Sequence, residues 1–455
     1  MRRMFYLPAV LLAVVSTLCM LTIPFALAEN REERKLYVGH NSSEAIMTFR
    51  YEVELGRKKP TQEFALRKIE EQLTYLFGPM GEAHYKGVPK GDHEISHLEI
   101  SRRSDGIYIA GYRYRGTVVL MNGPMTTYSL LLPRNPDTIY EAGIDADGLK
   151  PCTDWHYNTK DDFWYFWNPQ NENCPLREGV HYDRIRTSIE RRENTKLTYP
   201  DYPRLIHRGN VRIDILLGMD HEAHEAEERN PLTSNDINAV TYRGIRDDLA
   251  NMGFQRRQWS PEEIREIIQR TEQAHDLPFV EEFVKQHKKA KIIVRMFFGP
   301  SGITERSRSF HYFLKDAIAN GSIMVYSGHS GLGGHLDIES IEATEGFSIS
   351  FPRRYQIYYF NSCSSYPYYN TMYFARKATA GNPRGSRNLD IMTNGLATYF
   401  STLTFTDLSI VKAIDAWAGG VATLSYQKLA PEMDSGNLFG VNGDEDNPTE
   451  PPTRE

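Results

Sequence analysis

From residue 211 onward, short apolar runs alternate with segments of helical periodicity, and this alternation is the strongest constraint on the fold. It is typical of a parallel sheet covered by helices on both faces. We therefore predict an α/β domain with a mainly parallel sheet over residues 206–435. The strand-like runs are 211–219, 291–298, 321–326, 355–360 and 388–393. The helical segments are 236–252, 261–275, 277–289, 310–320, 366–377 and 407–417.

The region before residue 206 has a different pattern. A helical spacing over 60–77 is surrounded by strand-like runs, and Ser104-Asp105-Gly106 reads as a hairpin turn between two of them. This predicts a smaller α+β domain over 29–205 with a mainly antiparallel sheet. The last segment, 436–455, is rich in Asn, Asp, Glu, Pro and Thr and is expected to be a disordered tail. The strand-like runs of the smaller domain are 46–55, 94–102, 106–114, 116–121 and 126–132.

Residues 1–28 have the three parts of an export signal. Arg2 and Arg3 precede an apolar run, and Ala26-Leu27-Ala28 is a cleavage site of the small-x-small type. A membrane anchor is the alternative, but the run is short for a span and no basic cluster follows it. We expect an exported protein, periplasmic or secreted, with no integral membrane segment after cleavage. The sequence does not separate these two locations.

The net charge of the chain indicates which kinds of molecule it is expected to bind. The formal net charge is −6, and removal of residues 1–28 takes away two arginines and no acids, which gives −8. A mildly acidic chain without a long basic run is not expected to bind nucleic acid. The sequence leaves the oligomeric state open.

The cysteines divide into a pair and a single residue. Cys152 and Cys174 flank an aromatic-rich segment and are predicted to form a disulfide in an oxidising compartment. Cys19 leaves with the signal, so Cys363 remains unpaired. A buried core cysteine is the alternative for Cys363. Its Asn and Ser neighbours make a poor core environment.

Two polar turns follow the apolar runs 321–326 and 355–360. The first contains His329 and the second contains Cys363. The intervening residues suffice for the crossover between parallel neighbours, whose carboxyl ends meet at one sheet edge. A thiol beside an imidazole suits a nucleophile with its base. The backbone amides of Cys363 and of Ser330 or Gly331 are candidates for the oxyanion site.

The pattern resembles the caspase, gingipain, legumain and separase group of cysteine peptidases. In that group an apolar block ends in His-Gly, and a second apolar block ends in a small residue followed by Cys. The resemblance covers about residues 208–430 and implies a caspase-like three-layer domain with His329 and Cys363 as the dyad. One departure is Ser330, which stands where the group has Gly. No residue here can be matched to the group's specificity pocket.

Three alternatives accompany this interpretation. The sequence around Ser330 partly matches the serine-hydrolase elbow, although Leu332 replaces its final Gly. His221 and His224, among carboxylates, suggest a metal site, but the spacing is not that of H-E-x-x-H. A caspase-like domain that only binds a partner is the third. The sequence therefore predicts a cysteine endopeptidase that acts on a polypeptide substrate without metal or organic cofactor.

Overall fold

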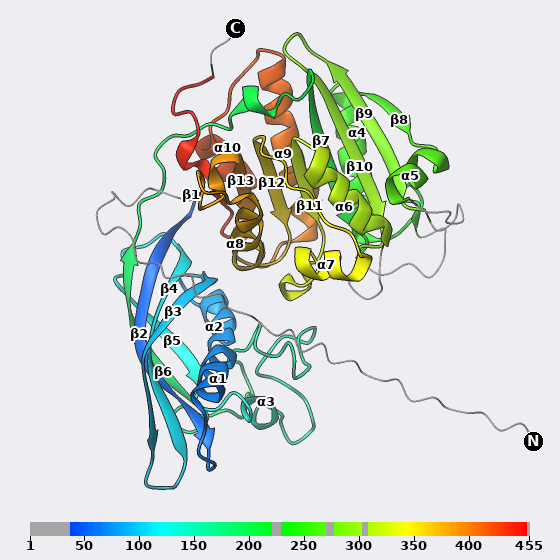
Figure 1. The fold of residues 1–455 in the computed structure, drawn as a ribbon. Helices are drawn as coiled ribbons and strands as arrows, with labels where there is room; N and C mark the ends of the chain where they lie inside the picture. The colour runs from blue at the N-terminus through cyan, green and yellow to red at the C-terminus, as the bar shows by residue number, and fades with distance from the viewer. Residues whose placement is uncertain (1–36, 221–228, 270–276, 303–307, 453–455) are drawn as a thin grey trace, which may run out of the picture. The chain divides into compact units, whose positions relative to one another are not determined.

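The structure is a computed structural model that describes residues 37–220, 229–269, 277–302 and 308–452 (Figure 1). Residues Lys35–Glu455 form one compact unit that contains two β-sheets. The fold is α/β, with a large mixed sheet and a smaller antiparallel sheet. Within the described ranges, none of the helices combines the length and the apolar character that a membrane crossing requires.

The larger sheet has nine strands in the order β1-β14-β13-β12-β11-β7-β10-β9-β8. The five central strands, from β13 to β10, are parallel, and the pairs at both edges are antiparallel. The expectation of parallel pairing therefore holds for the centre of the sheet. The strands are β1 (Tyr37–Gly39), β7 (Asn210–Gly218), β8 (Gln255–Gln258), β9 (Phe279–Gln286), β10 (Lys291–Gly299), β11 (Ile323–Ser327), β12 (Gln356–Asn361), β13 (Leu389–Thr393) and β14 (Gly440–Asn442).

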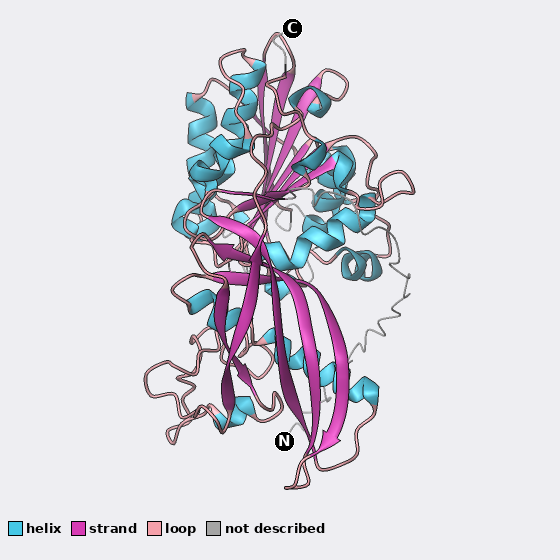
Figure 2. Ribbon diagram, turned by 90° about the vertical axis from the view of Figure 1, so that its left-hand side faces the viewer, coloured by secondary structure: helices cyan, strands magenta, loops and turns pink. Residues whose placement is uncertain are grey.

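Helices cover both faces of this sheet, which Figure 2 shows as a fan of strands between helices. One face packs against α4 (Ile237–Asn251), α9 (Phe400–Ala418) and α10 (Tyr426–Met433). The other packs against α5 (Pro261–Ile268), α6 (Arg308–Asn320), α7 (Ile338–Glu345) and α8 (Ser365–Lys377).

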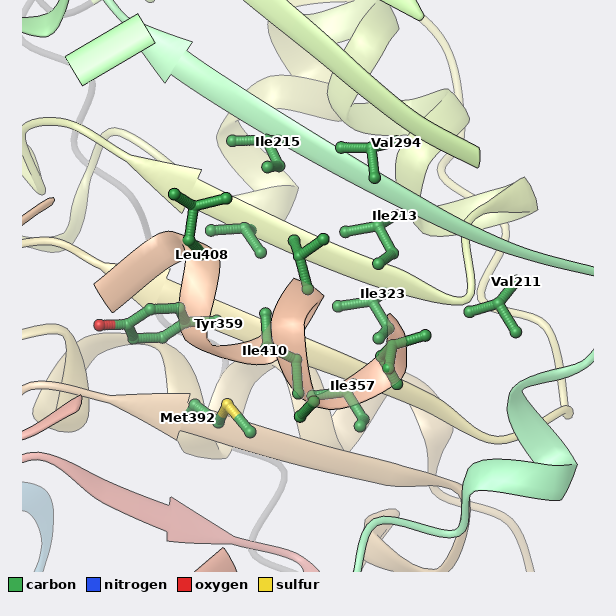
Figure 3. Close-up of a cluster of buried hydrophobic side chains, with 14 of the residues drawn as sticks. Val211, Ile213, Ile215, Val294, Ile323, Ile357, Tyr359, Met392, Leu408 and Ile410 are labelled. Atoms are coloured by element: carbon green, nitrogen blue, oxygen red, sulfur yellow. The ribbon is translucent and has the colours of Figure 1, made fainter. Parts of the chain in front are cut away.

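The central strands are apolar along their length because both of their faces are buried. Ile213 and Ile215 of β7 belong to the cluster under α4 and α9, whereas Leu216 belongs to the cluster on the opposite face. Figure 3 shows Ile213 and Ile215 with Leu408 and Ile410 of α9. This burial on both faces accounts for the continuous apolar runs in the sequence.

The smaller sheet is antiparallel throughout, in the order β3-β4-β2-β6-β5. A hairpin turn at Arg103–Ile107 joins β3 to β4, as the sequence predicted. Its strands are β2 (Ser42–Gly56), β3 (Gly87–Arg102), β4 (Tyr108–Met121), β5 (Thr127–Pro133) and β6 (Tyr182–Arg191), and its helices are α1 (Gln62–Thr74), α2 (Phe77–Glu82) and α3 (Ile139–Ala142). Short 3-10 turns that the structure describes include η1 (Tyr202–Leu205), η4 (Gly331–Gly333), η5 (Ser386–Asn388) and η6 (Asp444–Asp446).

Two predictions about local structure are wrong. Residues 277–289 were expected to be helical, but β9 lies there, antiparallel to β10. The apolar spacing Phe279, Val280, Phe283 fits a helix as well as a strand, so pairing with β10 decided the outcome. The tail from 436 was expected to be disordered, but β14 inserts between β1 and β13.

The tail is ordered because it contains a short apolar run. Leu438, Phe439 and Val441 are buried, and the backbone of β14 pairs on both sides. β1 lies in the predicted first domain but completes the larger sheet. The predicted boundary at 205/206 otherwise falls between β6 and β7.

Candidate active site

The two polar turns follow neighbouring strands. β11 and β12 are parallel neighbours in which Ser327 lies opposite Asn361, as the spacing of the apolar runs predicted. His329 and Cys363 each lie two residues beyond these strand ends. Both line one cavity of about 430 Å³. The fold therefore brings an imidazole and a thiol to the same hollow at the carboxyl edge of the parallel strands.

The cavity has two walls of different origin. The first, which we call the strand-end wall, consists of Gly328, His329, Asn361, Cys363, Ala397, Thr398, Phe400 and Leu403, which lie beyond or beside the ends of β11, β12 and β13. The second, which we call the loop wall, consists of Asp154, His156, Tyr157 and Phe166, from the segment between Cys152 and Cys174.

Cys363 is partly buried, and its sulfur accepts a hydrogen bond from the Thr398 amide at 3.4 Å. Burial raises the pKa of the Cys363 thiol, while the Thr398 amide and its own amide act in the opposite direction. The net shift is upward, so the neutral thiol is the resting form. The next residue, Ser364, has φ +47°, and α8 begins directly after it. A left-handed residue here turns the chain sharply and projects the thiol at the strand end.

His329 is held by a carboxylate. Its Nε2 lies 2.8 Å from Oδ1 of Asp220, which follows β7, the other neighbour of β11. The Asp220 amide in turn donates to Asp236 at 2.9 Å. Because a carboxylate only accepts hydrogen bonds, this contact assigns the proton to Nε2 and leaves Nδ1 as the basic nitrogen.

No hydrogen bond joins His329 to Cys363 in the part of the chain that the structure describes. The two residues share the cavity, and their bonded neighbours are Asp220 on one side and Thr398 on the other. Catalytic hydrogen bonds are often long or poorly aligned before substrate binds. The structure thus places a thiol and an imidazole on one cavity without a hydrogen bond between them.

A buried polar network lies beneath the strand ends. Asp407 of α9 accepts hydrogen bonds from Ser327 of β11 and, at 2.7 Å, from Asn361 of β12. Asn394 donates to Asn361 at 2.9 Å and to the Thr398 hydroxyl at 3.0 Å. Burial raises the pKa of Asp407 to about 7. One carboxylate therefore ties together the two strands that carry His329 and Cys363.

The loop wall is held by a disulfide and ring packing within its own segment and by a hydrogen bond to Ser364. The Cys152–Cys174 disulfide is formed, with an S–S distance of 2.07 Å, so this prediction is confirmed. The hydroxyl of Tyr165 lies 2.7 Å from Oγ of Ser364, next to the candidate nucleophile. Tyr157 packs against the Tyr165 ring with a centroid distance of 4.8 Å.

Ser330, the candidate serine nucleophile, is buried and is not among the residues that line the cavity. Its carbonyl accepts hydrogen bonds from the Tyr369 hydroxyl at 3.0 Å and the Gly333 amide at 3.0 Å. Gly331 likewise does not line the cavity, where Gly328 stands instead. The oxyanion role of the Ser330 and Gly331 amides remains a prediction.

The candidate metal residues His221 and His224 lie outside the described residues. Across 37–220, 229–269, 277–302 and 308–452, no group of three or more His, Cys, Asp or Glu side chains is arranged to hold a metal ion. Asp220, which the sequence grouped with those histidines, is described and binds His329.

Comparison with protein-family models, curated proteins and solved structures finds no match for this chain. The site therefore has to be interpreted from its own residues. Sequence reasoning considered Asp220 only beside the candidate metal residues and missed it as the partner of His329, and it missed Thr398 and Asp407 altogether. Asp220 follows a predicted strand, so the strand-end rule that identified His329 and Cys363 also applied to it. Thr398 and Asp407 have no sequence signal of this kind.

Proposed function

We propose that this chain is an exported cysteine endopeptidase with a caspase-like catalytic domain, in which Cys363 is the nucleophile and His329 the base. The observation that carries the proposal is that these two residues, from turns after adjacent parallel strands, line one cavity. A polypeptide substrate and an extracytoplasmic location belong to the same proposal.

The reaction follows from the protonation states. As Sγ of Cys363 attacks the scissile carbonyl, its proton passes to Nδ1 of His329 and a carbon–sulfur bond forms. His329 then gives this proton to the leaving amine as the carbon–nitrogen bond breaks, which leaves a thioester. Water then attacks the thioester carbonyl and gives a proton to Nδ1 of His329 as a carbon–oxygen bond forms. The carbon–sulfur bond breaks, His329 returns the proton to Sγ of Cys363, and the carboxylic acid product leaves.

Because the raised pKa keeps the Cys363 thiol neutral, its proton has to be removed while the sulfur attacks the carbonyl. A buried neutral thiol is a weaker nucleophile than a thiolate, so His329 has to approach Cys363 when substrate is bound. Asp220 supports this step, because it orients the imidazole and stabilises the imidazolium that forms. Asp220 is thus a positioning residue.

A partner-binding module without activity is the second candidate. The absence of a His329–Cys363 hydrogen bond among the described residues and the raised pKa of the thiol favour it. In that case the cavity would bind a peptide without cleaving it.

The deciding experiment measures cleavage of a general peptide library by the purified protein and by single-site variants. Cys363→Ala and His329→Ala are expected to lower kcat/KM by at least about 1000-fold, because the nucleophile or its base is lost. Asp220→Asn is expected to lower kcat by roughly 100- to 10,000-fold, because the imidazole loses the carboxylate that orients it. Ser330→Ala, at the neighbouring hydroxyl, is the matched control and should retain activity.

Two other outcomes of the cleavage assay would favour a different function. Loss of activity with Ser330→Ala and not with Cys363→Ala would favour a serine hydrolase. Folded wild-type protein that binds library peptides but never cleaves them would favour the binding module. Mass analysis of iodoacetamide-treated protein shows separately whether the reagent can reach the Cys363 thiol.

A further inference from the structure

The loop wall is apolar where it faces the cavity interior. Tyr157 and Phe166 are in ring contact with each other, with centroids 5.0 Å apart. The strand-end wall contributes Phe400 and Leu403 of α9 to the same cavity. A side chain that enters this space next to Cys363 is therefore surrounded by aromatic and aliphatic groups.

The charged groups of the cavity do not favour an acidic substrate. Among the described residues that line it, none is a lysine or arginine, and Asp154 is the only carboxylate. Oδ1 of Asp154 accepts hydrogen bonds from the His156 amide at 2.9 Å and faces the His156 ring nitrogen at 2.8 Å. The Asp154 and His156 side chains are about half exposed, at 43% and 57%. Asp154 and His156 thus hydrogen-bond to each other at the solvent-exposed edge of the cavity.

The loop wall is also preformed. Phe163 and Trp167 are buried in the core of the smaller sheet, and Cys152 and Cys174 close the segment covalently. Tyr165 links the same segment to Ser364, beside the nucleophile. Because this aromatic surface is already ordered, it loses little conformational entropy when a ligand binds.

We propose that the disulfide-closed segment 152–174 selects the substrate, and that Tyr157 and Phe166 favour a large apolar, above all aromatic, side chain beside Cys363. The inference rests on the proposed function for its peptide substrate. The binding preference itself can be measured without catalysis, since Cys363 reports on the cavity through its own alkylation.

The first experiment compares the alkylation rates of Cys363 by iodoacetamide and by N-(2-phenylethyl)iodoacetamide, each normalised to a free cysteine derivative. In the wild-type protein the phenylethyl reagent should be favoured. Tyr157→Ala and Phe166→Ala should each lower this preference by about 3- to 10-fold, the range expected for one aromatic contact. Tyr157→Phe, which keeps the ring, should preserve it.

Trp155→Ala is the matched control. Trp155 belongs to the same segment, is 74% exposed and does not line the cavity, so its loss should leave the preference unchanged. Circular dichroism shows whether each variant is folded. If Tyr157→Ala accelerates both reagents equally, the segment only covers the thiol and the proposal is overturned. Equal preference in wild type and variants also overturns it.

The second experiment varies the residue before the cleavage site in a peptide library. Preference for Phe, Tyr, Trp or Leu that weakens in Tyr157→Ala supports the proposal. Cleavage after acidic or basic residues would overturn the selectivity while leaving the peptidase function intact. A third outcome is that the phenylethyl reagent is preferred but no peptide is cleaved. This result would support the proposed selectivity and rule out the peptidase function.

Discussion

The two walls of the cavity are held in place by different physical means. The strand-end wall carries His329 and Cys363, and hydrogen bonds to the buried Asp407 fix its strand ends. The loop wall carries aromatic rings on an irregular segment, which a disulfide and ring packing hold in place. The candidate reactive groups thus follow directly after strand ends that buried hydrogen bonds fix, whereas the aromatic rings of the cavity come from a loop. Each wall can be weakened separately.

The largest effect is expected from removing residues 436–455, which acts on the strand-end wall. The Asn437 carbonyl accepts hydrogen bonds from the Gly395 and Leu396 amides, both at 2.9 Å, just before Thr398. Truncation also exposes the core around Phe439, and loss of one such ring alone costs about 3–5 kcal/mol. We expect no soluble folded protein, as judged by expression yield and circular dichroism.

Removal of residues 451–455 is the control for this truncation and should leave the protein folded, since Pro451 is exposed. A stable, folded protein without residues 436–455 would show that β14 is dispensable and that the strand-end wall does not depend on it.

Removing the disulfide is expected to weaken the loop wall alone. Cys152→Ser together with Cys174→Ser opens a loop with a sequence separation of 22 and should lower the free energy of unfolding by about 3 kcal/mol. Urea unfolding without reductant measures this loss. The phenylethyl preference at Cys363 should fall, while alkylation by iodoacetamide continues. Unchanged preference in the folded double variant would show that ring packing alone holds the wall.

The third effect concerns the pH dependence of the strand-end wall. Burial raises the pKa of Asp407 to about 7, so the folded state keeps a proton that the unfolded chain releases near pH 4. Stability from this group therefore decreases as pH rises from about 4 to about 7. Asp407→Asn cannot lose a proton, so the free energy of unfolding of the variant relative to wild type should rise over this range.

Urea unfolding at several pH values tests this expectation, and Glu339→Gln, at an exposed carboxyl of α7, is the control that should show no such trend. A difference between Asp407→Asn and wild type that is independent of pH would mean that Asp407 is already ionised at pH 4.

Much of the fold could be predicted because burial leaves a direct mark on sequence. The apolar runs of β7, β10, β11, β12 and β13 are continuous because both sheet faces are covered. The same runs located His329 and Cys363 at strand ends. β9 was misassigned because its spacing suits either periodicity, and β14 was missed because three residues among polar neighbours give too short a signal.

The sequence by itself determined the alternation of strands and helices, the paired and unpaired cysteines, and the two strand-end turns. These follow from local periodicity, turn chemistry and residue type. Only the tertiary structure decided that Asp220 binds His329, that Asp407 ties β11 to β12, and that Tyr157 and Phe166 line the same cavity as Cys363. Such contacts join residues about 45 to 200 positions apart, and their selection depends on how the sheets and helices pack, which no local pattern encodes.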